Sequence, residues 1–249
     1  MKRLVAMALC GLVAAGATGW AKDKPVVIAK GTQIGVVNLL DPELMHYHAA
    51  KDSHGSFIKI QAVDWNVDDM LNQALQSQAS PQGLTLMPLA PGNTLLHARE
   101  SCFVNASLAK GLPKSCTASL TELAAGAGVS YLIVMAPGLN NSDHAGSNRL
   151  EGASETLRGW GLITREMAGA KDRPTLFNEV EMLLINVTPQ GAVLSARQWG
   201  GMFITQWQTY TVPPDPKVIP PEQLDELQPL FGNLLTRQTK ELIDQLHVE

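Results

Sequence analysis

The chain lacks the features that would place it in several large classes of protein. It has no run of basic residues, and acidic residues outnumber basic ones by 23 to 19 among its 249 residues. Nucleic acids and anionic membrane surfaces are bound through clustered lysines and arginines, so the sequence argues against both as partners. It contains no internal repeat, and no apolar stretch after residue 21 is long enough to cross a bilayer.

Familiar catalytic motifs are missing as well. No Gly-x-Ser-x-Gly elbow stands between a predicted strand and a helix, and no His-Glu-x-x-His string occurs. The glycines of Gly126-Ala127-Gly128 end a predicted helix and precede a strand, which is the wrong order for a phosphate-binding loop. Asp64, Asp68 and Asp69 are explained by the start of a helix, with an acid–base pair as the alternative. The sequence therefore favours a non-catalytic protein, without a cofactor.

Cysteine is scarce, and the three cysteines fall into two groups. Cys10 lies within an apolar run at the start of the chain, where a lipoprotein cleavage site is disfavoured by the bulky Leu9 before it. Cys102 and Cys116 enclose a loop of about 15 residues, for which loop entropy gives a disulfide worth ~3 kcal/mol. We predict this disulfide because the chain is expected to be exported, and two buried free thiols are the alternative.

Export is predicted from residues 1–21. Lys2 and Arg3 are followed by an Ala/Leu/Val-rich run, which ends in the small-residue pattern Gly19-Trp20-Ala21. This pattern is typical of a secretory signal peptide cleaved near Ala21. Removing Lys2 and Arg3 leaves 17 basic against 23 acidic residues, so the mature chain would be acidic. We expect a periplasmic or secreted protein, with no transmembrane segment in its mature form.

The hydrophobic pattern predicts an α/β fold: a mixed sheet with packed helices, a late antiparallel meander and a C-terminal amphipathic helix. Residues 22–30 predict a polar, mobile start. Predicted strands cover residues 33–40, 44–50, 57–63, 84–89 and 129–135, the last buried on both faces, and the meander covers 157–167, 175–187 and 192–200. Helices are predicted after residue 64, from 95 to 108, from 117 to 125 and from 221 onward. The domain would span residues 22–210, with a proline-rich strap and helix (211–249) packed on it.

These elements resemble small exported α/β proteins of Gram-negative bacteria. The strand ending at Leu40, the helix ending at Gly126-Ala127-Gly128 before the strand at 129–135, the meander and the closing helix follow the order of a nucleotide-binding-like fold. That fold is found in curli-secretion and Tol-type periplasmic auxiliary proteins. The resemblance implies an envelope location and an envelope protein partner, and the name of the fold does not imply nucleotide binding.

Histidines supply the main candidate site. His46, His48 and His54 lie within nine residues, and on a strand His46 and His48 would point the same way. Two imidazoles and a third ligand would suit Zn²⁺ or Cu²⁺; surface histidines on a polar-faced edge strand are the alternative. Asn140, Asp143 and His144 form a second cluster in the long loop 137–156, as a contact loop, a general base or a cation ligand. Glu179 and Glu181 share one strand face, which predicts that this face is partly solvated.

The leading hypothesis is a non-catalytic exported protein that binds a partner or assists envelope assembly through this loop and the C-terminal helix. The alternative is a zinc-binding protein or metal-dependent hydrolase that uses the three histidines. A purely structural envelope protein is the third hypothesis.

Overall fold

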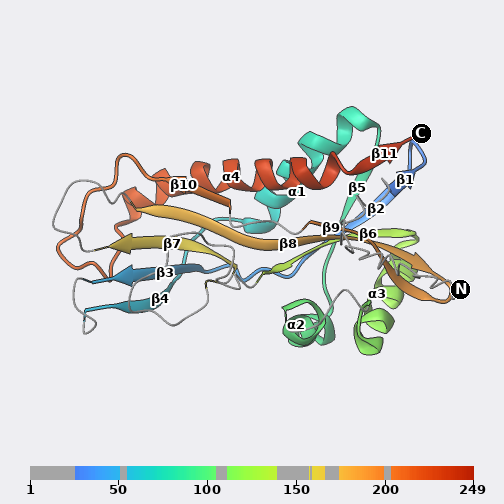
Figure 1. Cartoon of the computed structure of the whole chain (residues 1–249), viewed down its shortest axis with the longest axis horizontal. Coiled ribbons are helices and arrows are strands. Elements are labelled where there is room, and N and C mark those ends of the chain that lie inside the picture. Colours follow the sequence, from blue (N-terminus) through green and yellow to red (C-terminus); the bar gives the residue numbers. More distant parts are fainter. Residues whose placement is uncertain are drawn as a thin grey trace, which may run out of the picture.

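A nine-stranded mixed sheet forms the centre of the computed structural model, which describes residues 26–50, 55–104, 111–138, 157, 159–165, 174–198 and 203–249 (Figure 1). The nine strands are β2 (Gln33–Asn38), β3 (Leu44–Ala49), β4 (Phe57–Gln61), β5 (Thr85–Leu89), β6 (Tyr131–Pro137), β7 (Gly159–Arg165), β8 (Thr175–Thr188), β9 (Gly191–Gln198) and β10 (Phe203–Gln206). A separate two-stranded sheet contains β1 (Val26–Ile28) and β11 (Leu246–Val248). The helices are α1 (Val67–Ala79), α2 (Asn93–Arg99), α3 (Lys114–Ala127) and α4 (Pro221–Ile243). The predicted α/β class, with its late meander and C-terminal helix, is confirmed.

The long strand β8 joins two halves of this sheet. Its first residues pair with β7 and β10, and its later residues pair with β6 and β9. Beyond β6 lie β2 and β5, in parallel with it, and beyond β7 lie β3 and then β4. We call the strands β5, β2, β6 and β9 the helix-covered half, and the strands β4, β3, β7 and β10 the histidine half.

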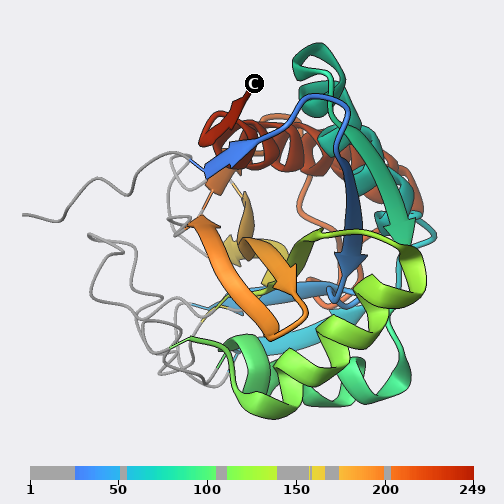
Figure 2. The ribbon, with the colours of Figure 1, turned by 90° about the vertical axis from the view of Figure 1, so that its right-hand side faces the viewer.

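Helices cover the sheet unequally. Helices α1 and α4 pack on one face, whereas α2 and α3 pack on the other, over the helix-covered half (Figures 1 and 2). Strand β6 is therefore enclosed on both sides, and Leu132, Ile133 and Val134 have no exposed surface, as its continuous apolar sequence predicts.

The C-terminal helix belongs to the main core. Phe231 of α4 stacks on Trp160 of β7, with ring centroids 4.3 Å apart, and Trp65 lies 5.5 Å from Trp160. Leu227, Leu234 and Leu242 of α4 are also buried in this cluster. Helix α4 thus spans both halves of the sheet on one face. None of the helices in the described part of the chain combines the length and the apolarity needed to span a bilayer.

Local sequence explains the helix ends. The side chain of Asn66 accepts a hydrogen bond from the backbone N of Asp69 and caps α1, whose first turn holds Asp68 and Asp69. Gly128 ends α3 in the left-handed conformation, at φ 68°. Helix α3 begins three residues earlier than predicted, and α2 gives way to a π-helical turn at Glu100–Val104, within the helix predicted for residues 95–108.

A disulfide and a strand pairing join further segments of the fold. Cys102 and Cys116 are bonded, with their Sγ atoms 2.05 Å apart, and this links the π-helical turn to α3. On the opposite face, in the cluster that includes α1 and α4, β1 pairs in parallel with β11, so that Val26 lies opposite Leu246. The prediction that residues 22–30 form a polar, mobile start is wrong for Val26–Ile28, because the last strand of the chain supplies their hydrogen-bond partners.

Candidate functional site

The chain reverses its winding direction between β2 and β6. From β2 the chain first forms β3 and β4, and it then reaches β5 on one side of β2 through α1. From β5 it returns to β6 on the other side of β2 through α2 and α3, on the opposite face. In open α/β sheets, ligands bind beside the carboxyl ends of the strands at such a switch point. Here these ends are Asn38 of β2 and Pro137 of β6, and Pro137 pairs with Val180 in the middle of β8.

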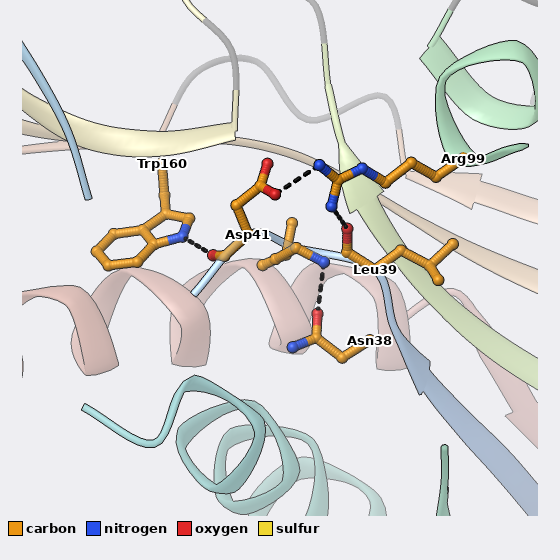
Figure 3. A network of polar contacts seen from close by, with 6 residues as sticks. Asn38, Leu39, Asp41, Arg99 and Trp160 are labelled. Atoms are coloured by element: carbon orange, nitrogen blue, oxygen red, sulfur yellow. Dashed lines mark hydrogen bonds and ion pairs between the residues drawn. The ribbon is translucent and has the colours of Figure 1, made fainter. Parts of the chain in front are cut away.

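A network of polar contacts fixes the carboxyl end of β2 (Figure 3). Arg99 donates one hydrogen bond to Leu39 O, at 3.2 Å, and another to the carboxylate of Asp41, at 2.5 Å. Trp160 Nε1 donates to Asp41 O, at 2.9 Å, and the Asn38 side chain accepts from the backbone N of Leu40. Arg99 comes from α2 and Trp160 from β7, so this network joins both faces of the sheet.

A phosphate-binding role at the start of α1 is disfavoured by the charges found there. A helix N-terminus attracts anions through its free backbone N–H groups. In α1, Asn66 occupies one of these groups, and the carboxylates of Asp68 and Asp69 lie in the first turn. Asn38 Nδ2 donates to Asp68 Oδ1 at 2.7 Å, so one carboxylate lies directly at the end of β2. A phosphate would meet like charge at this position.

Two carboxylates lie on the other side of the switch point, in the middle of β8. Glu179 and Glu181 project from the face that carries α2 and α3, with Glu181 opposite Ala136 and Glu179 beside Gly138. A Cβ atom on Gly138 would lie 3.4 Å from Glu179 Oε1, so the carboxyl group covers this glycine. Glu179 is only 8% exposed, and Oε2 has no hydrogen-bond partner among the described groups. The predicted solvated strand face is therefore wrong at Glu179.

Burial and charge act in the same direction on this carboxyl group. Removal from water disfavours the charged form, and the neighbouring Glu181 carboxylate disfavours it further; together they raise the pKa of Glu179 from 4.5 to about 7. Perturbed carboxyl groups of this kind concentrate at functional sites. Glu179 thus changes its charge close to neutral pH.

The histidine pair lies on the opposite face of the histidine half. His46 Nε2 lies 2.7 Å and His48 Nδ1 lies 2.8 Å from Thr164 Oγ1, which β7 supplies. One hydroxyl therefore bridges the two rings, and both histidines point the same way, as the strand period predicts. Phe57 of β4 stacks on His48, with centroids 4.9 Å apart.

His46 differs from the surface histidine that the alternative interpretation described. It is 1% exposed, because β3 lies inside the sheet between β4 and β7 rather than at its edge. Burial first, and then the nearby charges of His48 and Lys59, lower the pKa of His46 to about 4. The ring is therefore neutral at pH 7, and Nδ1 has no hydrogen-bond partner among the described groups.

The other predicted site residues fall outside the part of the chain that the structure describes. These are His54, the contact-loop residues Asn140, Asp143 and His144, and also Cys10 and Ala21. Within the described residues, no three histidine, cysteine or acidic side chains are grouped to hold a metal ion.

Sequence reasoning did not identify Thr164 or Arg99 as site residues. Thr164 meets the histidines through the parallel pairing of β3 with β7, which begin more than one hundred residues apart. Arg99 meets Asp41 through the packing of α2 against the end of β2. No pattern of neighbouring residues in the sequence predicts either of these contacts. Polar residues just after a predicted parallel strand, such as Asp41 after β2, were the one available signal.

Comparisons with known proteins add little. No family model matches the chain, and no curated protein matches it. Among solved structures, the chain is similar to the hypothetical protein CT253 from Chlamydia trachomatis, with a TM-score of 0.40 and 9% sequence identity over 86% of this chain and 95% of that one. Neither the fold family nor the function follows from a similarity of this size.

Proposed function

We propose that the protein is an exported, non-catalytic binding protein, and that Glu179 and Glu181 receive a cationic group of its partner. The observation that carries this proposal is the Glu179 carboxyl group, which is nearly buried at the switch point, with Oε2 unpartnered among the described groups. Its pKa of about 7 reflects burial and the neighbouring Glu181 carboxylate, both of which disfavour the charged form. An ammonium or guanidinium group would offset the cost of the charged form.

The surrounding polar groups support binding at Glu179 in particular. Asp41 is paired with Arg99, Asn38 bonds Asp68, and the two histidines share Thr164 on the other face. Glu179 lies over Gly138, which has no side chain to cover it. Glu179 Oε2 is buried and has no hydrogen-bond partner among the described groups, and a carboxyl group in this state suits a lysine or arginine of a partner.

The predicted signal peptide and the bonded cysteines support an exported protein, because disulfides persist in oxidising compartments. On these grounds we propose the periplasm as its location and an envelope protein as its partner.

The test is calorimetric titration of the mature protein, residues 22–249, with a tetralysine peptide as the probe at pH 6 and pH 8. We expect tighter binding at pH 8, where Glu179 is ionised, and at least tenfold weaker binding for Glu179→Gln. Glu222→Gln, an exposed change in the first turn of α4, is the matched control and should bind as the unchanged protein does. Equal binding by Glu179→Gln would refute the proposal. Turnover of a ligand that Glu179→Gln abolishes would show an enzyme instead.

The zinc-binding alternative is favoured by one observation, the convergence of His46 Nε2 and His48 Nδ1 on a single atom. Elemental analysis of the mature protein, purified without chelator, tests it. Near-stoichiometric zinc or copper that is lost in His46→Ala, and retained in His97→Ala, would support this second function.

A further inference from the structure

Edge strands of a sheet carry unpaired backbone N–H and C=O groups, and proteins usually protect them from pairing with other chains. The described sheet has four outer strands, β4, β5, β9 and β10, each of which pairs on one side only. Their protection differs, and this difference singles out β4.

Three of these edges carry a recognisable protecting feature. Strand β5 contains Pro88, which has no N–H to offer another strand. Strand β10 has Ile204 O engaged by Arg237 of α4, at 3.4 Å. The pairing of β9 with β8 shifts register between Leu184 and Ile185, and such a bulge twists an edge away from a flat partner.

Strand β4 has a lysine at its centre, but the lysine side chain does not protect the open edge. Lys59 Nζ donates to Lys217 O, at 2.7 Å, so the ammonium group is held over one face of the sheet rather than beside the open edge. On the other face, Ile58 and Ile60 are 37% and 60% exposed, and both belong to the large apolar side chains that are exposed in the described part of the chain. In the described chain β4 pairs with β3 alone. An unpaired edge and an exposed apolar row therefore coincide.

Charge beside this edge indicates what kind of strand would fit. Lys59 lies on the same face as Phe57, and Lys217 Nζ lies 5.8 Å from the Phe57 ring centroid. The Asp215 carboxylate accepts from the backbone N of Lys217, at 2.9 Å, and no described carboxylate forms an ion pair with either ammonium group. One face of an added strand would therefore meet isoleucines, and the other would meet two lysines.

We propose that the free edge of β4 docks an extended segment of a partner protein in which apolar and acidic residues alternate. The segment adds as a further strand next to β4. Its backbone pairs with the open edge, its apolar side chains lie beside Ile58 and Ile60, and its acidic side chains lie toward Lys59 and Lys217. In such β-strand addition the main chain gives affinity and the alternating side chains give specificity.

The experiment uses the mature protein and two blocked synthetic peptides, Val-Glu-Val-Glu-Val-Glu-Val and its counterpart with lysine in place of glutamate. Amide hydrogen exchange, read by NMR, reports which edge is covered. We expect the glutamate peptide to protect alternate amides of β4, and Ile60→Asp to weaken its binding at least tenfold. Lys59→Glu should exchange the preference between the two peptides. Ile204→Asp, on the protected edge of β10, is the matched control and should leave binding unchanged.

Three outcomes would overturn the proposal: no protection by either peptide at millimolar concentration, protection of β5, β9 or β10 instead, or dimers joined through β4 in sedimentation experiments. The last result would identify a second copy of the chain as the occupant. Melting temperatures of the three variants, measured in parallel, exclude unfolding as the cause of lost binding. Because these peptides are read at β4, the result is separate from lysine binding at Glu179.

Discussion

The two halves of the sheet share β8 but are built differently. In the helix-covered half, α2 and α3 lie on one face and α1 on the other, the disulfide joins two of the covering segments, and β6 contributes apolar side chains to both faces. In the histidine half, the buried side chains include His46 and Thr164, and the outer strand β4 leaves two isoleucines exposed. The helix-covered half is thus held by apolar packing and a disulfide. The histidine half buries polar side chains, and burying a polar group costs free energy unless it is hydrogen-bonded.

The carboxylates lie where these two halves meet. Glu179 pairs with Gly159, the first residue of β7, and its backbone O accepts from Gly138 N, just after β6. The carboxyl group of Glu179 and the imidazole of His46, whose pKa values are strongly shifted, therefore lie at the junction and in the histidine half. Three experiments test whether this division is real.

The largest effect is expected from adding one methyl group at matched glycines in the two halves. In the histidine half, a Cβ on Gly161 would collide with the backbone O of Met45, which cannot move without displacing β3. In the helix-covered half, a Cβ on Gly35 would meet the ends of the Leu89 and Leu132 side chains, at 2.5 and 2.7 Å, and these can rotate. We expect Gly161→Ala to lower the free energy of unfolding by about 3 kcal/mol or more, and Gly35→Ala by about 1–2 kcal/mol.

Urea denaturation of the mature protein measures both changes. Gly126→Ala is the control, because a Cβ there meets nothing within 4 Å and alanine favours the helical state of α3. If Gly35→Ala proved as costly as Gly161→Ala, the idea that the helix-covered half accommodates side-chain changes would fail.

The next effect concerns the disulfide, which belongs to one half only. Replacing Cys102 and Cys116 by alanine opens a loop of 14 residues in sequence separation, and loop entropy gives a loss of about 3 kcal/mol. We expect amide protection to fall mainly in α2 and α3, while β3 and β7 keep theirs, in hydrogen exchange under native conditions. Equal loss of protection in both halves would show one cooperative unit instead of two.

The same comparison explains how much could be predicted from sequence. Strand β6 and helix α4 were predicted because burial on both faces, or along one stripe, leaves a local pattern of apolar residues. The common direction of His46 and His48 followed from the two-residue period of a strand. These are properties of neighbours along the chain.

What failed depends on segments that meet only in the folded molecule. Val26–Ile28 form β1 because the last residues of the chain supply a parallel partner. The period of β8 put Glu179 and Glu181 on one face, but it did not show that this face is covered at Glu179. Thr164 reaches the histidines only because β7 pairs with β3. The division of the sheet into halves likewise comes from pairing along β8 and leaves no local signal.

The smallest effect is a change in the pH dependence of stability, and it compares the two halves most directly. The pKa of His46 is about 4 in the folded protein and 6.5 as the ordinary value, so between these pH values the unfolded chain binds more protons and stability rises with pH. The pKa of Glu179 is about 7 in the folded protein against 4.5, so there the folded chain binds more protons and stability falls as pH rises. Each slope is about 1.4 kcal/mol per pH unit, and between pH 4.5 and 6.5 the two oppose one another.

Removing one group should therefore expose the slope of the other. Relative to the unchanged protein, Glu179→Gln should gain stability with rising pH between 4.5 and 6.5, by about 1.4 kcal/mol per unit, and His46→Gln should lose stability with the opposite slope. Urea denaturation at half-unit pH steps measures both, and Glu222→Gln and His97→Gln, at exposed positions, are measured in parallel. Parallel curves for Glu179→Gln and His46→Gln would mean that the two groups do not titrate independently. The junction and the histidine half would then form one electrostatic unit, because a charge on either face of the sheet would be felt on the other.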